Sequence, residues 1–418
     1  MKNSEFTIDS FTSKKIKLLG FFSILALLYI HNGSGTNAIM TPSMLVTKEF
    51  QWNEVVQNFI LNGLLRFRLP LMMITSGFFL FYRSKRSYLK LITSKIKTII
   101  FPYLLISLSG LIITFIFETF FVPQNSVYAF SGMIGKKMID LSFVEIISYI
   151  LKSPIVFQLW YLRVLFMFVL FVPLIRYLIT KIPLLSLSAM LLFWLFTNYI
   201  GGVENDRGYL FFFIGAYLAI HQVDTSKQFT FFTAKASLTI FILLSIVKTY
   251  ITFYATHLFG MHTAFSVSFI YKLNEILGLY GVWFIFDTVL LKMMSRSFWM
   301  KLTESSFFVY AFHAPLIIFL NNIIKLSDNI FSKNTMLSFL LLPLIVLFIT
   351  LMTEDIMKRL SLKFYSILTG GRSKAGIFKF DPEIFSLPQV SFSRKLVWVS
   401  SLSSFIIIAV AGAVVFFK

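Results

Sequence analysis

Residues 98–121 read TIIFPYLLISLSGLIITFIFETFF, and Glu118 is the one charged residue in this stretch. About 20 consecutive apolar residues are enough to cross the hydrocarbon core of a bilayer as a helix. Because lipid offers no water to the peptide groups, a helix is the conformation that satisfies such a stretch. Similar stretches recur along the chain and predict ten or eleven membrane spans, which we place at 17–36, 57–82, 98–121, 155–179, 183–200, 208–222, 236–258, 264–291, 305–324, 336–353 and 397–417.

The composition also indicates a membrane protein. Of the 418 residues, 57% are hydrophobic and 13% are charged, whereas soluble domains carry about 25% charged residues. The sequence therefore predicts an all-α integral membrane protein without a soluble domain, so any chemistry has to lie among the helices. The absence of cysteine excludes disulfides and thiolate metal sites. We assign the net charge of +20 to cytoplasmic loops and anionic lipid headgroups and not to nucleic-acid binding.

The distribution of basic residues predicts the orientation. If the N-terminus is cytoplasmic and Lys17 is counted with it, the inner segments hold 25 Lys and Arg and the outer segments hold eight. Loops that carry the excess of Lys and Arg face the cytoplasm. We therefore expect a multi-pass protein of the cell membrane with a cytoplasmic N-terminus. Residues 14–30 resemble a signal peptide in pattern, but no soluble domain follows them, so we expect this span to be retained.

The spans divide the chain into four predicted parts. These parts are a cytoplasmic N-terminal segment at 1–16, a membrane domain of about ten spans at 17–355, a basic cytoplasmic link at 356–396 and a further transmembrane helix at 397–418. The membrane domain is expected to carry the function, because it contains nearly all of the ionisable residues that fall within spans.

Ionisable side chains inside a bilayer are costly and are functional candidates by default. Neutral histidine can serve as a base near neutral pH. Acyl transfer to a sugar hydroxyl needs such a base, and it needs a cation or donor that faces the oxyanion of the tetrahedral intermediate. Transporters use the same residue types in proton relays, so the chemistry alone leaves both functions open. The candidates within the predicted spans are His31, Arg66, Arg68, Arg163, Lys272, Glu275 and His313.

Both histidines also have structural interpretations. His31 lies towards the outer end of the first span, where it could cap the helix at the level of the lipid headgroups. His313 lies in the middle of its span and could hydrogen-bond a carbonyl that Pro315 leaves without a partner.

The charged candidates have structural interpretations as well. Lys272 and Glu275 are i, i+3 neighbours on a helix and could neutralise each other. Arg163 could pair with a headgroup or with a neighbouring helix. Arg66 and Arg68 are two positions apart and point to different faces of a helix, so we expect one of them at most to face a given site.

Six motifs in a fixed order add a family resemblance. They are SILALLYIHN at 23–32, RFRLPLMMITSGFFL at 66–80, SKIKTIIFPYLL at 94–105, QLWYL at 158–162, YLFFFIGAYL at 209–218 and YAFHAPL at 310–316. In this order, the chain from about residue 14 to 355 resembles the acyltransferase-3 family of bacterial integral-membrane O-acyltransferases, in particular its surface-polysaccharide O-acetyltransferase type.

The resemblance implies roles for individual residues. It makes His31 the presumed catalytic histidine and Arg66 the matching arginine of the second helix, and we add His313 to this catalytic group. The supporting residues that we assign are Ser76, Gly77, Trp160, Arg163, Lys272, Glu275 and Tyr310.

The resemblance also implies an acyl-CoA donor, with acetyl-CoA the first choice, and no bound cofactor or metal. Family members often carry a basic residue eleven positions before the first-helix histidine, and that position is Gly20 here. Lys17 stands about one turn earlier, roughly 4.5 Å along the axis, so we assign donor binding to Lys17 and Arg68. A lysine lacks the bidentate geometry of arginine.

The acceptor implied by the family is a surface glycan or a lipid-linked sugar. The alternatives are a glycolipid or polysaccharide transporter or flippase, for which inverted repeats and broken helices are expected, and a non-catalytic subunit of a glycan-assembly complex, which Gly20 leaves open. A homo-oligomer is also open. The sequence does not identify the acyl group or the sugar.

Overall fold

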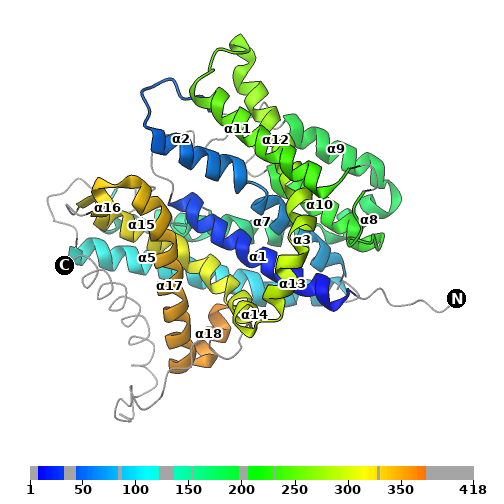
Figure 1. Ribbon diagram of the computed structural model, residues 1–418. Helices are drawn as coiled ribbons and strands as arrows, with labels where there is room; N and C mark the ends of the chain where they lie inside the picture. Colours follow the sequence, from blue (N-terminus) through cyan, green and yellow to red (C-terminus); the bar gives the residue numbers. More distant parts are fainter. Residues whose placement is uncertain are drawn as a thin grey trace. The chain divides into compact units, whose positions relative to one another are not determined.

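The computed structural model describes residues 8–32, 44–82, 87–121, 136–152, 154–196, 206–229, 232–326 and 330–372. Every regular element in these ranges is a helix, and none of the described residues forms a strand (Figure 1). The predicted all-α fold is confirmed. The predicted last span at 397–417 lies outside the described residues.

Four helical stretches are long and apolar enough to cross a membrane, at Trp52–Tyr82, Tyr88–Phe120, Ala234–Phe253 and Thr335–Leu360. The described residues hold up to seven such spans if each of three bent helix pairs counts as one. The protein is thus a multi-pass membrane protein. The count is lower than ten or eleven because the helix at Ser10–His31 is not among these stretches, Pro183–Phe196 and Gly208–Ile220 are short, and 397–417 lies outside the described residues.

The helices divide into two compact units that are interleaved in sequence. The first unit contains residues 1–92 and 167–303, and the second contains residues 93–166 and 304–418. Both units contain residues of the predicted membrane domain at 17–355. The division of the chain into four parts stays a prediction. Three helices, α4 (Tyr88–Lys95), α7 (Trp160–Leu170) and α14 (Ser297–Glu304), contain the points where the chain passes from one unit to the other.

The first unit contains most of the candidate residues. Its helices are α1 (Ser10–His31), α2 (Trp52–Asn58), the π-helix η2 (Phe59–Leu64), α3 (Arg68–Tyr82), α8 (Val172–Lys181), α9 (Pro183–Phe196), α10 (Asp206–Ile220), α11 (Ala234–Phe253), the 3-10 helix η7 (Gly260–His262), α12 (Thr263–Ile285), α13 (Asp287–Met294) and α14 (Ser297–Glu304).

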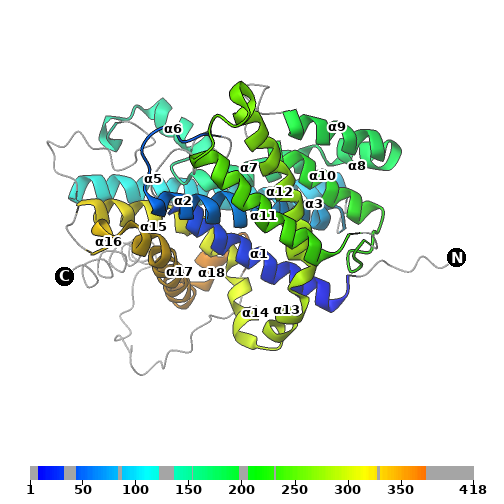
Figure 2. The same ribbon diagram turned by 45° about the horizontal axis from the view of Figure 1, so that its top comes forward.

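Three helix pairs organise this unit, and Figures 1 and 2 show them side by side. Helix α3 packs along α10, α11 packs along α12, and α1 packs against α3. Leu18 and Leu19 of α1 join Leu71 of α3 in one buried cluster, together with Val282 and Leu290. This cluster holds α1 against α3, the helix that begins just after Arg66.

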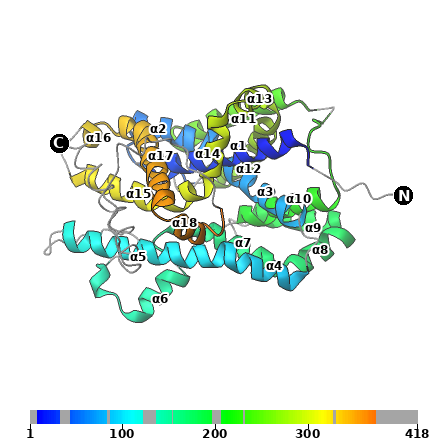
Figure 3. The same cartoon turned by 90° about the horizontal axis from the view of Figure 1, so that it is seen from below.

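The second unit contains the π-helix η3 (Ile96–Ile100), α5 (Phe101–Phe121), the 3-10 helices η4 (Met138–Asp140) and η5 (Phe157–Leu159), α6 (Phe143–Leu151), α15 (Ser306–Leu326), α16 (Ile330–Lys333), α17 (Thr335–Leu360) and α18 (Leu362–Leu368). Helix α15 packs on α17, and α5 contacts α6 and α18 (Figure 3). Glu354 of α17 is buried between Lys358, at 2.9 Å, and the Tyr365 hydroxyl, at 2.6 Å. The first part of the predicted link at 356–396 is helical, because it contains the end of α17 and all of α18.

Candidate functional site

Within the single stretch Trp52–Tyr82, the α-helical winding is interrupted where Arg66 occurs. The chain runs through α2 and the π-helix η2, turns at Leu65–Phe67 and continues as α3. Helical turns of π type are frequent at functional sites because they displace the side chains that follow. Arg66 therefore lies in a turn between helices and not on a continuous helix face.

Arg66 is buried and held by its own element. Its guanidinium donates two hydrogen bonds to Asn62 Oδ1, with Nε at 2.9 Å and Nη2 as the second donor. The Cζ atom stands 5.3 Å from the centre of the Tyr271 ring on α12. The planar cation is thus oriented before any ligand arrives.

Arg68 is also buried but has a different contact. Its Nη1 donates to the carbonyl of Leu65 at 2.7 Å, where the π-helix ends. Arg66 and Arg68 therefore contact different groups, the Asn62 side chain and the Leu65 carbonyl. The assignment of Arg68 to donor binding stays a prediction.

Tyr271 connects several polar side chains of α12 and its neighbours. Its hydroxyl donates to Glu275 Oε1 at 2.5 Å, and both residues are buried. Lys272, one position along, donates instead to the carbonyls of Trp194 and Leu195, with the Leu195 oxygen at 3.0 Å. These carbonyls lie in the last turn of α9, where a cation satisfies otherwise unpaired acceptors. Lys272 and Glu275 thus have separate roles besides any mutual neutralisation.

Lys248 on α11 was not among the candidates drawn from the sequence. Its side chain is fully buried, and Nζ stands 5.9 Å from the centre of the Tyr271 ring. Two side chains of the same neighbourhood meet beside it, where Asn274 Nδ2 donates to Ser245 Oγ at 2.9 Å. We call Arg66, Lys248, Tyr271 and Glu275 the Tyr271 cluster. The available signal was a lysine inside a predicted span, which belonged to no recognised motif.

His31 is the last residue of α1 and is half-buried. The following residue, Asn32, is buried and caps the helix through its backbone N–H, which contacts the Leu28 carbonyl at 3.1 Å. His31 shares the first unit with the Tyr271 cluster. A helix end suits both the capping role and the catalytic role, so the function of His31 as a base stays a prediction.

The lysines of α1 differ in environment. Lys17 is exposed, and a Cβ added at Gly20 would meet no heavy atom within 4 Å. Lys15 is buried, pairs with Asp287 at 2.6 Å and stands 4.6 Å from the centre of the Trp283 ring. Lys15 therefore ties α1 to α13, whereas Lys17 is exposed.

Ser76 and Gly77 lie on α3, at its contact with the YLFFFIGAYL motif of α10. A Cβ at Gly77 would be 3.1 Å from the Phe212 carbonyl carbon and 3.2 Å from the Ala216 nitrogen, and a Cβ at Gly215 would meet the backbone of Ile74. Such backbone contacts require glycine on both helices. Gly77 therefore has a packing role, while Ser76 is half-buried beside it.

The QLWYL and YAFHAPL motifs meet in the second unit. Pro315 has no N–H, so the carbonyl of Ala311 has no donor from its own helix. Gln158 Nε2 donates to that carbonyl at 2.9 Å, and the Tyr310 hydroxyl donates back to the Gln158 carbonyl. The carbonyl that Pro315 releases is therefore capped by Gln158 and not by His313, which corrects that structural interpretation of His313.

His313 is fully buried, and its Nδ1 lies 2.9 Å from the Val309 carbonyl. A carbonyl oxygen can only accept, so Nδ1 carries the proton and a neutral His313 keeps its lone pair on Nε2. This tautomer has the form that a general base requires.

Two further supporting residues lie nearby in the second unit. Trp160 is half-buried, 6.1 Å from the ring of Tyr161, which in turn lies 5.9 Å from the ring of Tyr310. The Arg163 guanidinium donates to the carbonyl of Lys152, directly after α6. Arg163 thus contacts a neighbouring helix end, which is one of its two structural interpretations.

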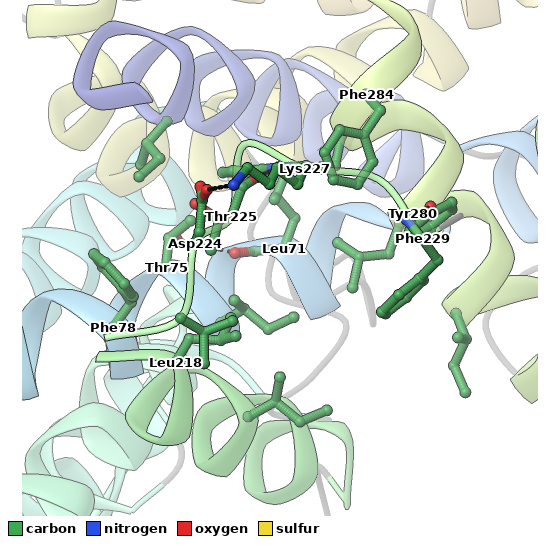
Figure 4. A pocket seen from close by; sticks show the side chains of 17 residues that line it. Leu71, Thr75, Phe78, Leu218, Asp224, Thr225, Lys227, Phe229, Tyr280 and Phe284 are labelled. Carbon is green, nitrogen blue, oxygen red and sulfur yellow. Dashed lines mark hydrogen bonds and ion pairs between the residues drawn. The ribbon is translucent and has the colours of Figure 1, made fainter. Parts of the chain in front are cut away.

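A cavity of about 310 Å³ lies within the first unit, between α3, α10, α12 and the loop that follows α10 (Figure 4). Apolar side chains such as Phe78, Leu218 and Phe284 line most of it. Asp224 and Lys227 pair there at 3.4 Å, and the Ser226 hydroxyl and N–H hold the pKa of Asp224 below its ordinary value. The lining suits hydrocarbon and includes none of the predicted catalytic or donor-binding residues.

The residues that the structure describes include no group of three or more His, Asp or Glu side chains placed to hold a metal ion. The polar groups that are brought together instead are the Tyr271 cluster in the first unit and the Gln158–Tyr310–His313 group in the second. The first combines two buried basic side chains with a hydroxyl and a carboxylate, and the second combines an amide, a hydroxyl and an imidazole.

Comparisons with known proteins agree with these motifs. Residues 15–354 match the family model described as an acyltransferase domain. The chain is 22% identical over 374 residues to the succinoglycan biosynthesis protein ExoH of Rhizobium meliloti (strain 1021), which covers 88% of this chain and 95% of that protein. No solved structure gives a significant match. Because the family model covers most of the chain, this membrane protein belongs to the acyltransferase-3 family.

Proposed function

We propose that this protein is a membrane O-acyltransferase that moves an acyl group, acetyl in the first instance, from acyl-CoA to a hydroxyl of a surface polysaccharide or a lipid-linked glycan precursor. The family assignment supports acyl transfer, and the relative named for succinoglycan biosynthesis supports a glycan acceptor. The observation that carries the proposal is the buried, pre-oriented Arg66 guanidinium in the break between η2 and α3.

In the proposed reaction, His31 and Arg66 have separate roles. His31 takes the proton of the acceptor hydroxyl while its oxygen attacks the thioester carbonyl carbon, and Arg66 faces the oxyanion that forms. The carbon–sulfur bond then breaks, and the histidinium returns its proton to the leaving thiolate. A preoriented donor in a site of low dielectric stabilises such an oxyanion more than water does.

Arg66 suits this role because Asn62 fixes two of its nitrogen atoms. The guanidinium has five donor N–H groups in a planar fork, and Asn62 holds two of its nitrogen atoms. Its orientation over Tyr271 adds a cation–π contact that holds the plane. Little reorganisation is then needed when charge develops on the substrate.

The test is mass spectrometry of surface glycans from cells that carry the wild-type gene, no gene, or variants of it. We expect His31→Ala and His31→Gln to abolish the acyl mass, because general-base assistance is worth about 10²–10⁴ in rate. Glutamine keeps a hydrogen-bonding side chain but cannot act as a base near neutral pH. His262→Gln is the matched control, since His262 is exposed at the end of the 3-10 helix η7.

Each result has a defined meaning when variants insert in the membrane at equal amounts. Near-normal acylation by His31→Gln would show that His31 is structural. Loss in His313→Gln together with retention in His31→Gln would move the base to His313. An unchanged glycan in the strain without the gene would favour a transporter or a non-catalytic subunit.

The acyl donor and the orientation are part of the same proposal. With the N-terminus in the cytoplasm, the exposed Lys17 lies near the inner end of α1, where acyl-CoA is available. His31 lies at the other end of the same helix, where an exported or lipid-linked glycan arrives. A cysteine accessibility scan of single-cysteine variants tests this orientation, since the chain contains no native cysteine.

A further inference from the structure

The cavity between α3, α10, α12 and the loop after α10 lies along the helices (Figure 4). One face of α3, from Leu71 to Phe78, and one face of α12, from Ile276 to Phe284, form two of its walls. These faces extend about 10–12 Å along their helices, which is less than the roughly 15 Å of hydrocarbon in one leaflet of a bilayer. Ile276 is 39% exposed and Phe229, on the loop, is 60% exposed, so part of the lining is open to the surroundings.

The protein itself binds the polar side chains in these walls. The Thr75 hydroxyl donates to a carbonyl of its own helix at 2.9 Å, and the Trp283 ring N–H donates to the Thr225 carbonyl at 2.9 Å. The Tyr280 hydroxyl accepts the Phe229 N–H at 2.9 Å and donates to a loop carbonyl at 2.8 Å. A water molecule in a cavity needs two to four polar partners. Because these groups bond within the protein, the walls suit an apolar occupant.

The volume of the cavity sets the size of that occupant. A cavity of about 150 Å³ lined by Leu, Ile and Phe binds benzene, a hydrocarbon of about six carbons. At about 310 Å³, the cavity of this protein accommodates roughly 10–12 carbons on the same scale. This length is most of one acyl chain, and a protein that spans a bilayer is surrounded by such chains.

The loop side of the cavity is charged. Asp224 and Lys227 lie on the loop after α10, with side chains that are 53% and 83% exposed, and they pair at 3.4 Å. Ser226 holds the carboxylate through its N–H at 3.0 Å and its hydroxyl at 2.6 Å. An exposed ion pair contributes little to stability, so the Lys227 ammonium can contact another anion at little cost. The cavity thus combines an apolar interior with a cation on its loop side, as an amphiphile with an anionic headgroup requires.

We propose that this cavity binds one acyl chain of a membrane phospholipid, with the phosphate of the headgroup at Lys227. Ile16 of α1 and Phe78 of α3 line the cavity together with the loop after α10. The orientation predicted from the basic residues places these ends of α1, α3 and α10 towards the cytoplasm. The phospholipid therefore comes from the cytoplasmic leaflet.

The acyl group that is transferred in the proposed reaction does not lie in this cavity. Ile16 lines the cavity, and His31 is at the other end of the same helix, about 22 Å further along the axis. A lipid-linked glycan is expected at the His31 end, on the opposite side of the membrane. The choice of a phospholipid over these two substrates rests on the proposed function, whereas the apolar cavity and its charged loop do not.

The experiment measures lipid binding to the purified and delipidated full-length protein by native mass spectrometry. The probes are didodecanoyl phosphatidylethanolamine, dodecanol as a chain without phosphate, and farnesyl phosphate as an isoprenoid carrier. Leu218→Trp fills the cavity from α10, and Lys227→Ala removes the cation. The matched controls are Leu243→Trp and Lys235→Ala, because Leu243 and Lys235 are exposed on α11 and lie outside the lining of the cavity.

We expect the wild type to bind the phosphatidylethanolamine more tightly than either other probe. Leu218→Trp should weaken that binding at least about 10-fold, because each methylene displaced from an apolar site costs about 4-fold in affinity. Lys227→Ala should weaken it about 2–5-fold, the value of an exposed charge contact, and should leave dodecanol binding unchanged. Both controls should bind all probes like the wild type.

The proposal fails if Leu218→Trp binds the phospholipid like the wild type, or if dodecanol binds as tightly as the phospholipid, since the headgroup contact is then absent. Tighter binding of farnesyl phosphate would overturn the phospholipid as the occupant and assign the cavity to an isoprenoid carrier. Thermal unfolding checks that each variant is folded, and Ile214→Phe fills the cavity with a smaller change if Leu218→Trp does not fold. Binding needs no acyl transfer, so the failure of the proposed reaction leaves this result readable.

Discussion

The crossing of α3 and α10 provides the sharpest test of the packing. In Gly77→Ala, the new methyl carbon would lie 3.1 Å from the Phe212 carbonyl carbon and 3.2 Å from the Ala216 nitrogen, and closer still to the Phe212 oxygen. These are backbone atoms and cannot rotate away. The two helices therefore have to separate before the variant can pack.

The expected cost follows from overpacking of a close-packed contact. Inserting one methyl group into such a site costs about 1–3 kcal/mol, and the separated helices also lose dispersion contacts along the crossing. Gly215→Ala meets the Ile74 backbone from the other side and should cost a similar amount. Because one separation accommodates both methyl groups, the double variant should cost less than the sum of the two.

The assay is thermal unfolding of the detergent-solubilised protein, followed as the fraction that stays monodisperse after heating. Gly20→Ala is the matched control, since its Cβ meets nothing within 4 Å and alanine favours a helix by about 1 kcal/mol. That control should unfold at the wild-type temperature or above it. A wild-type transition in Gly77→Ala would refute the argument that this glycine is required by backbone contact.

Two other perturbations test separate parts of the structure. Gln158→Leu removes the donor to the Ala311 carbonyl that Pro315 releases, so the same thermal assay should show a loss of about 1–3 kcal/mol; an unchanged transition would show that the carbonyl is satisfied in another way. Lys17→Ala should raise the KM for the acyl-CoA donor more than it lowers kcat, because a remote phosphate contact is mostly uniform binding, and the open space at Gly20 predicts that adding Gly20→Arg restores the donor KM. Unchanged donor affinity in Lys17→Ala would leave that lysine with a topological role alone.

Local properties of the sequence determined the class of the protein. Apolar stretches of about 20 residues predicted helices because each peptide group bonds within its own segment. The stretch at 236–258 became α11 at Ala234–Phe253, and the stretch at 336–353 became part of α17 at Thr335–Leu360. The ordered motifs predicted the family, which the match over residues 15–354 confirms.

The tertiary structure decided what each polar side chain contacts. Lys272 reaches a carbonyl 78 positions away in the sequence, and Gln158 reaches one 153 positions away. Such partners depend on how helices pack, and the apolar pattern of a membrane helix does not distinguish a lipid-facing side from a protein-facing side. Lys248 was not among the candidates for this reason, because its burial beside Tyr271 depends on the packing of α11 against α12.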